Sequence, residues 1–280
     1  MGMTQYSILP GAPVSVQNGV LVARFNSRIV SATMTEKLSR REFLAAASLT
    51  AAGLACSSSR GSQISNRIPV RSNTTILFQG DSITDSGRNR TIATANTASA
   101  LGTGYPLLIA SAVLEADAGR GLRFFNRGVG GDRVPDLQAR WQTDTIALAP
   151  DVLSILVGVN DYWHKRTRGY TGTVADYENG YVALLEQTRR ALPNVRFIVM
   201  EPFVLRVGAV DASWFPEFDE RRAAAERVAS RTGATFVRLQ SHFNDLAATA
   251  PPEYWAADGV HPTPAGHAVI AERWRETVGI

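Results

Sequence analysis

Two short motifs in this sequence carry the residue types that nucleophilic acyl transfer requires. Ser82, a candidate nucleophile, ends the triplet Gly80-Asp81-Ser82 and directly follows an apolar run. His261 is a candidate general base, and Asp258 precedes it by three residues. Such a base activates the serine by taking its proton, and the carboxylate holds the imidazole in one tautomer and stabilises the imidazolium that forms.

Two further motifs could stabilise the oxyanion that forms when the serine attacks. Gly131 lies in the glycine-rich stretch 126–132, and Asn160 lies in Gly158-Val159-Asn160-Asp161. The backbone N–H of Gly131, the side-chain amide of Asn160 and the N–H of Ser82 would supply three donors, each typically worth about 3–4 kcal/mol of barrier. Each motif also has a structural interpretation, because glycine clusters make turns and Asn-Asp pairs cap helices.

A parallel sheet would bring these motifs together. From Thr74 onward, short apolar runs alternate with helical patterns. We predict strands at Thr75–Phe78, Leu122–Phe125, Val152–Val157, Val195–Met200 and Thr235–Leu239, and helices at about Tyr105–Ala118, Val134–Leu148, Val174–Leu192, Phe218–Arg231 and Pro264–Thr277. This alternation predicts an α/β fold, a three-layer α/β/α sandwich with a five-stranded parallel sheet in the flavodoxin-like order 2-1-3-4-5. Ligands of such sheets bind at the carboxyl ends of the strands, where we expect the motifs to meet.

The ordered set Gly-Asp-Ser, Gly131, Gly-x-Asn-Asp and Asp-x-x-His resembles the SGNH hydrolase superfamily, also called GDSL esterases. The resemblance runs from about Thr74 to the C-terminus. It implies the SGNH hydrolase fold and a serine esterase that needs no cofactor and no metal. The residues that it assigns to the catalytic triad are Ser82, Asp258 and His261, and those that it assigns to the oxyanion hole are Gly131 and Asn160.

Longer stretches around the motifs narrow the resemblance. The segments GDSITDSGR, LGTGYPLLIAS, NRGVGGDRVPDLQARW and VGVNDYW are similar to the branch of acetylxylan esterases and related carbohydrate acetylesterases. This implies removal of acetyl groups from carbohydrate through an acyl-enzyme on Ser82. Arg88 resembles an arginine of that branch, whereas Gly130-Gly131 stands where many relatives have Ser-Gly. Three aromatic residues flank the motifs and could stack on sugar rings or pack in the core: Trp163, Tyr254 and Trp255.

Other functions fit parts of the same pattern. A lysophospholipase or thioesterase of the same superfamily would favour an apolar acyl groove, while the loop 83–104 after Ser82 is polar and favours a polar substrate. A metal-dependent phosphoesterase would need several His and carboxylate ligands that converge on its metal ions, and the chain has only four histidines, which disfavours this alternative. A catalytically dead carbohydrate-binding protein would have no need of Asp258 and His261 at this spacing.

The N-terminal region has the sequence of an export signal. Ser39-Arg40-Arg41-Glu42-Phe43-Leu44 is a twin-arginine signature, and an apolar run to Ala55 follows it. We predict an N-terminal extension and export signal at 1–56, a linker at 57–73 and the SGNH hydrolase domain at 74–280. Cys56, the sole cysteine, is a candidate lipid anchor, and cleavage without lipidation is the alternative. A start at Met34 would give a leader of ordinary length.

This leader also explains the net charge of the chain. Residues 1–56 hold five basic and two acidic residues, which leaves 24 basic and 23 acidic ones in the rest. Because basic and acidic residues are nearly equal in number in residues 57–280, the composition gives no indication of nucleic-acid binding. We therefore expect an exported protein, periplasmic or extracellular, that acts on a small ester or an acetylated saccharide. No membrane span is predicted, and the sequence makes no prediction of oligomeric state.

Overall fold

The computed structural model describes residues 5–7, 13–17, 20–25, 28–33 and 70–280. The chain divides into two units, Met1–Gln63 and Ile64–Ile280, and each is described by itself. The predicted export signal, Cys56 and residues 57–69 of the predicted linker lie outside the described residues.

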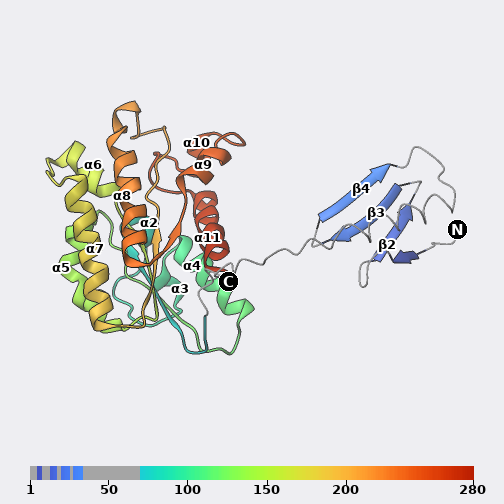
Figure 1. Cartoon of the computed structure of the whole chain (residues 1–280), viewed down its shortest axis with the longest axis horizontal. Coiled ribbons are helices and arrows are strands. Elements are labelled where there is room, and N and C mark those ends of the chain that lie inside the picture. Colours follow the sequence, from blue (N-terminus) through green and yellow to red (C-terminus); the bar gives the residue numbers. More distant parts are fainter. Residues whose placement is uncertain (1–4, 8–12, 18–19, 26–27, 34–69) are drawn as a thin grey trace, which may run out of the picture. The chain divides into compact units, whose positions relative to one another are not determined.

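The N-terminal unit contains an antiparallel sheet that the sequence analysis did not predict (Figure 1). Its strands are β1 (Gln5–Ser7), β2 (Pro13–Gln17), β3 (Val20–Phe25) and β4 (Arg28–Thr33), in the order β1-β2-β3-β4. β2 pairs with β3 from Val14 opposite Ala23 to Gln17 opposite Val20. The sequence held a signal for this pairing, since Asn18-Gly19 between two valine-rich runs is a favoured two-residue hairpin turn.

The C-terminal unit is built on a five-stranded parallel sheet in the order β6-β5-β7-β8-β9. Its strands are β5 (Thr75–Gly80), β6 (Arg123–Asn126), β7 (Val152–Leu156), β8 (Arg196–Met200) and β9 (Thr235–Val237). In chain order this is 2-1-3-4-5, so the predicted topology is confirmed. The first two runs extend one to two residues beyond their predicted ends, and the last one stops two residues early.

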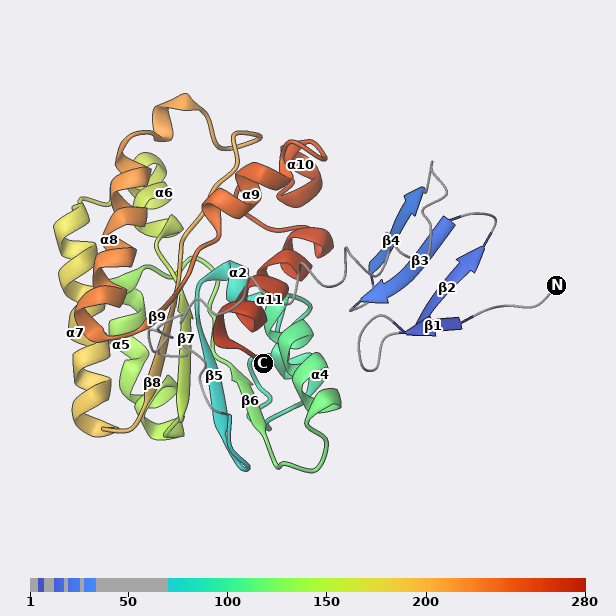
Figure 2. The same ribbon diagram turned by 45° about the vertical axis from the view of Figure 1, so that its right-hand side comes forward.

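Helices cover both faces of this sheet (Figure 2). One face carries α4 (Tyr105–Ala116) and α11 (Pro264–Val278), and the other carries α5 (Val134–Asp144), α7 (Val174–Ala191) and α8 (Glu217–Thr232). Successive side chains of β5 alternate between the two cores: Ile76 and Phe78 pack with α4 and α11, and Leu77 packs with α5 and α7. Burial on both faces favours apolar side chains at successive positions of the strand, which explains the Ile-Leu-Phe run at its centre.

The remaining helices of this unit are short. They are α2 (Ser82–Asp85), α3 (Ala98–Leu101), α6 (Val159–Arg168), α9 (Gln240–Leu246), α10 (Pro252–Trp255) and the 3₁₀ turns η1 (Ile146–Leu148) and η2 (Ala212–Trp214). The predicted helix to Leu148 ends at Asp144, and η1 forms its remainder. Among the described residues, no helix is long and apolar enough to cross a bilayer.

Candidate active site

Ser82 lies where β5 ends and α2 begins. Gly80 has φ of +151°, and a Cβ there would lie 2.1 Å from the carbonyl oxygen of Leu156, so a side chain at this position would collide with β7. The Asp81 carboxylate then caps α2 by accepting the N–H of Ile83 at 3.0 Å. The turn therefore leaves Ser82 half-buried at the carboxyl edge of the sheet.

The structure places His261 and Asp258 next to Ser82. The Oγ of Ser82 lies 2.9 Å from His261 Nε2, and His261 Nδ1 lies 2.6 Å from Asp258 Oδ2. These residues come from opposite ends of the domain, since 179 positions separate the serine from the histidine. The three side chains thus form one continuous hydrogen-bonded chain.

The hydrogen bonds of Asp258 define the protonation of this chain. Its Oδ1 accepts the backbone N–H groups of Val260 at 2.9 Å and His261 at 2.7 Å. Partial burial raises the pKa of the Asp258 carboxyl, but the bonds from the His261 ring and from the two N–H groups outweigh it, and the net shift is downward. An ionised Asp258 must receive a proton from His261 Nδ1, so the Nε2 lone pair faces the hydroxyl of Ser82.

Gly131 lies in the loop after β6, beside the serine. The φ of Gly131 is +89°, which glycine adopts without strain. A Cβ placed on the preceding residue, Gly130, would lie 3.7 Å from the Cβ of Ser82, an ordinary contact. The loop is held by bonds from Val129 N to Gly80 O and from Asp132 N to Val129 O, neither of which uses the Gly131 N–H.

Three charged residues, Asp85, Arg88 and Arg90, connect this loop to the first turns after β5. The Asp85 Oδ2 accepts the Gly130 N–H at 3.1 Å and also pairs with Arg90. Arg88 is buried, and its Nε donates to the Gly128 carbonyl at 2.8 Å. Burial lowers the pKa of Arg88 to about 10, so it stays charged at neutral pH. Together these contacts connect the serine's helix to the loop that carries Gly131.

Asn160 lies in the first turn of α6 and donates a hydrogen bond to the same loop. Its Nδ2 donates to the carbonyl of Asp132 at 3.2 Å, which leaves its second amide hydrogen for another acceptor. Its neighbour Asp161 accepts the N–H of Val134 at the start of α5. Arg140 of α5 pairs with Asp132 at 2.7 Å and donates to the Arg127 carbonyl at 2.7 Å. The predicted oxyanion residues are therefore tied into one network.

Two buried carboxyl groups, those of Asp81 and Asp161, lie next to residues of the candidate site. Desolvation, with smaller contributions from the negative charges of Asp161 and Asp132, outweighs the hydrogen bond from Ile83 and raises the pKa of Asp81 to about 7. Desolvation likewise raises the pKa of Asp161 to about 7. The Asp81 Oδ2 has no hydrogen-bond partner among the described residues. Burial thus favours the uncharged form of both acids.

A second Ser–His pair lies close to the first. The Oγ of Ser86 is 3.4 Å from His267 Nε2, while His267 Nδ1 accepts the backbone N–H of Tyr105 at 3.2 Å. Desolvation, helped by the nearby His261, lowers the pKa of His267 to about 4. His267 is therefore neutral at pH 7 and carries its proton on Nε2, so it donates to Ser86.

The three aromatic residues singled out in the sequence lie in different environments. The ring of Trp163 packs 5.9 Å from the ring of His261, and it also contacts Trp214. Tyr254 and Trp255 meet edge to face at 4.9 Å, with Tyr254 55% exposed and Trp255 packed against the core. Of the three, Trp163 is the one whose ring packs near the candidate catalytic histidine.

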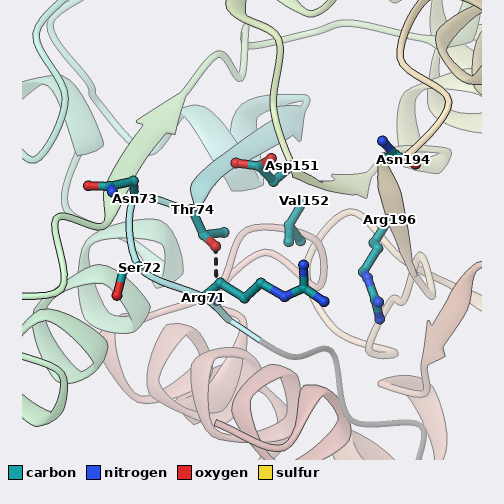
Figure 3. A pocket seen from close by; sticks show the side chains of 8 residues that line it. All are labelled: Arg71, Ser72, Asn73, Thr74, Asp151, Val152, Asn194 and Arg196. Atoms are coloured by element: carbon teal, nitrogen blue, oxygen red, sulfur yellow. Dashed lines mark hydrogen bonds between the residues drawn. The ribbon is translucent and has the colours of Figure 1, made fainter.

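A cavity of about 530 Å³ opens at the other edge of the sheet, near the amino ends of β5 and β7 (Figure 3). Two of its polar side chains bind backbone N–H groups: Asp151 accepts the Thr75 N–H at 2.8 Å, and Thr74 accepts the Arg71 N–H at 3.0 Å. No histidine lines this cavity. Within the described part of the chain, no three His, Cys, Asp or Glu side chains converge as metal ligands.

Comparison with known proteins agrees with this geometry. The profile of the GDSL-like lipase/acylhydrolase family matches residues 78–269. The chain belongs to this family. It is 35% identical over 210 residues to an acetylxylan esterase of Geobacillus stearothermophilus, which covers 73% of the chain and 93% of that protein. The GDSL family and this relative identify the chain as a serine carboxylic-ester hydrolase.

Solved structures of GDSL hydrolases share the fold. A structure of a GDSL-like lipase candidate from Parabacteroides merdae is 45% identical with a TM-score of 0.75, covering 76% of this chain and 99% of that one. The acetylxylan esterase Axe2 of Geobacillus stearothermophilus is 32% identical with a TM-score of 0.69, covering 76% and 97%. The predicted resemblance to SGNH hydrolases of the acetylxylan esterase branch is thereby confirmed.

Some residues of this GDSL hydrolase were not predicted as part of the site, because their contacts arise only from folding. Asp85, Arg90 and Arg140 had no predicted role, although their charges near the glycine-rich segments were a usable signal. The pair Ser86 and His267 was missed because nothing in the sequence indicates that residues 181 positions apart meet.

Proposed function

We propose that this hydrolase removes acetyl groups from carbohydrate hydroxyls through an acyl-enzyme on Ser82. The observation that carries the proposal is the hydrogen-bonded chain from Ser82 through His261 to Asp258. Crystal structures of Axe2 include catalytic mutants in which a serine or a histidine is replaced by alanine. Those relatives support the same roles for Ser82 and His261 here.

In the first half of the reaction, Ser82 Oγ attacks the acetyl carbonyl carbon while His261 Nε2 takes the hydroxyl proton. The negative charge moves to the carbonyl oxygen, where the Gly131 N–H, the free Nδ2 hydrogen of Asn160 and the Ser82 N–H would stabilise it. Collapse of this intermediate breaks the bond to the sugar oxygen, which takes the proton back from His261. The sugar leaves with a free hydroxyl, and Ser82 keeps the acetyl group.

In the second half, water replaces the sugar. His261 takes a proton from the water as its oxygen attacks the acetyl carbon, and the same donors stabilise the second oxyanion. Breakage of the ester bond releases acetate and returns the proton to Ser82. Asp258 stays ionised throughout and stabilises each transient imidazolium.

A carbohydrate ester is favoured over a lipid by the surroundings of the serine. Among residues 70–280, the exposed large hydrophobic side chains are Leu108 and Tyr254, which do not amount to a groove for a long acyl chain. The cleft that reaches Gly131 is lined largely by charged and polar groups. The similarity to an acetylxylan esterase over 93% of its length points the same way.

The test is acetate release by the full chain from acetylated xylo-oligosaccharides, beside p-nitrophenyl esters of increasing acyl length. We expect acetate from the saccharides and kcat/KM values that fall as the acyl chain grows. Values that rise with chain length would support the lysophospholipase or thioesterase alternative instead. Loss of activity in EDTA that is restored by a divalent ion would support a metal-dependent phosphoesterase, and absence of all hydrolysis would support a carbohydrate-binding protein.

We further propose that the protein is exported by the twin-arginine route to the periplasm or beyond. The support is the Ser-Arg-Arg-Glu-Phe-Leu signature at 39–44 with its apolar run. N-terminal sequencing and mass spectrometry of exported protein test this: a lipid-modified Cys56 indicates an anchor, and an unmodified new terminus indicates simple cleavage. If the protein is found only in the cytoplasm and still carries residues 39–55, the proposal is wrong.

A further inference from the structure

A cleft of about 420 Å³ lies directly beside the candidate oxyanion loop. Its lining includes Gly131, Arg133, Asp136, His164, Arg168 and Tyr170. We call it the Arg168 cleft. A Cβ placed on Gly131 would lie 4.0 Å from His164 Cε1, so the cleft begins at the residue proposed to bind the oxyanion. A substrate with its ester at Ser82 therefore has this cleft within reach of its other groups.

One helix runs from the oxyanion site into the cleft. Asn160, His164 and Arg168 are spaced four residues apart in α6, so they share one face of the helix. With a rise of 1.5 Å per residue, Arg168 lies about 12 Å along the axis from Asn160. Gly169 then ends the helix in the left-handed conformation, with φ of +67°. This distance is longer than one sugar ring, so Arg168 would meet a neighbouring residue of an oligosaccharide.

One wall of the cleft is electrostatically satisfied. Arg133 holds Asp136 with its Nε at 2.7 Å and its Nη2 at 3.0 Å, and it packs 4.3 Å over the ring of Tyr170. Asp132, deeper in the cleft, is paired with Arg140 at 2.7 Å. These pairs use up the acidic groups that line the cleft.

Arg168 on the other wall has no such partner among residues 70–280. The two other cations of the same helical turn are both bound: Lys165 pairs with Glu217 at 2.8 Å, and Arg166 donates to the Ser213 hydroxyl at 2.7 Å. The pKa of His164 is lowered, first by burial and then by the positive charges of Arg168 and Arg133. His164 is therefore neutral at pH 7, and the positive charge of Arg168 acts on it. The cleft is thus lined by one arginine whose charge is not paired with an acidic side chain among residues 70–280.

We propose that the Arg168 cleft binds the carboxylate of a uronic acid residue in the substrate, a sugar or two from the acetylated one. The inference rests on the proposed carbohydrate esterase function and names its substrate class, an acidic acetylated oligosaccharide. A guanidinium matches a planar carboxylate with two parallel hydrogen bonds, and the neutral His164 offers a further ring N–H. The competing interpretation is that Arg168 only complements the dipole at the C-terminus of α6.

The experiment compares two acetylated xylo-oligosaccharides of equal length, one neutral and one carrying a glucuronic acid branch, with the full chain. Wild type should release acetate from the acidic substrate with a kcat/KM about 5- to 10-fold higher, the size expected for a charge-assisted hydrogen bond at a partly exposed site. Arg168→Gln should bring the ratio close to one while leaving p-nitrophenyl acetate hydrolysis unchanged. Arg168→Lys should keep part of the preference, and added salt should reduce it.

Arg190→Gln is the matched control. Arg190 is likewise an exposed arginine in the last turn of a helix, α7, but it does not line the cleft. This variant should keep the preference of wild type. Equal kcat/KM on both substrates in wild type, or a preference that survives in Arg168→Gln, overturns the inference alone. Hydrolysis of p-nitrophenyl acetate without acetate release from either saccharide overturns the proposed function as well.

Discussion

Two Ser–His pairs lie side by side in this domain, and we assign catalysis to one of them. Ser82 with His261 and Ser86 with His267 involve the same residue types, and in each pair the serine oxygen lies within 3.4 Å of the histidine Nε2. The serines are four residues apart in the chain, and the histidines are six apart. Proximity of a serine to a histidine therefore does not distinguish a nucleophile from a structural hydroxyl.

The group at Nδ1 makes the difference. His261 Nδ1 faces the carboxylate of Asp258, which keeps a proton there and leaves Nε2 free to accept one. His267 Nδ1 instead accepts a backbone N–H, which forces the proton onto Nε2. Exposure adds to this difference: the side chain of His261 is 46% exposed, whereas His267 is buried and desolvation lowers its pKa to about 4. A base needs a free lone pair and a stabilised cation, and only the first pair provides both.

The largest expected effect separates the two serines. Ser82→Ala and His261→Ala should each lower kcat on short acetyl esters by about 10⁶-fold, and the double variant should be little worse, because the residues act as one unit. Steady-state kinetics measure this. A double variant far slower than either single one would mean that the two side chains act independently.

Asp258→Asn should have a smaller effect, about 10⁴-fold on kcat, because the geometry survives while the imidazolium loses its charged partner. The measurement is kcat on the same ester at pH 8. An unchanged rate would show that the carboxylate at Nδ1 is not what distinguishes His261 from His267.

Asn160→Ala should lower kcat by about 10²- to 10³-fold with little change in KM, because its amide would meet charge that develops only in the transition state. Comparing kcat with KM on one ester tests this. A change confined to KM would instead indicate that Asn160 binds the ground-state substrate.

His267→Asn should affect stability in acid, not catalysis. The pKa of His267 falls from 6.5 unfolded to about 4 folded, so the unfolded chain binds the proton more readily and stability is lost as pH falls from about 6.5 through 4. Between pH 8 and pH 5 this group costs wild type roughly 2 kcal/mol of unfolding free energy. Urea unfolding at both pH values should show a smaller drop in the variant, with kcat at pH 8 within a few-fold of wild type.

The smallest expected effect is that of Ser86→Ala, whose kcat should stay within two-fold of wild type. A serine-directed phosphonate provides the sharper test, since fragment-ion mass spectrometry can separate the two serines on one tryptic peptide. Label should be found on Ser82 alone and should vanish in Ser82→Ala. Label on Ser86 in the wild-type protein would contradict the assignment of roles.

The sequence by itself determined the fold of the C-terminal unit and singled out its candidate catalytic side chains. Strands buried on both faces are largely apolar, so Ile76-Leu77-Phe78 and the corresponding runs could be recognised as strands without knowledge of their neighbours. The site motifs were readable because parallel strands place their carboxyl ends at one edge. The antiparallel strands before residue 34 were not predicted, although the sequence contains a hairpin-turn signal. The whole region was interpreted as an extension of the export signal that follows it.

Only the tertiary structure decided which of the polar residues support the site. Three features depend on distances between segments that are far apart in the chain. They are the hydrogen bond from Gly130 N–H to Asp85, the backbone N–H that His267 Nδ1 accepts, and the absence of an acidic partner for Arg168 among residues 70–280. The local pattern of apolar and polar residues predicts whether a segment forms a strand or a helix. It does not predict which distant side chain will accept a given hydrogen bond. That choice is made by burial and by hydrogen-bond geometry, which exist only once the chain has folded.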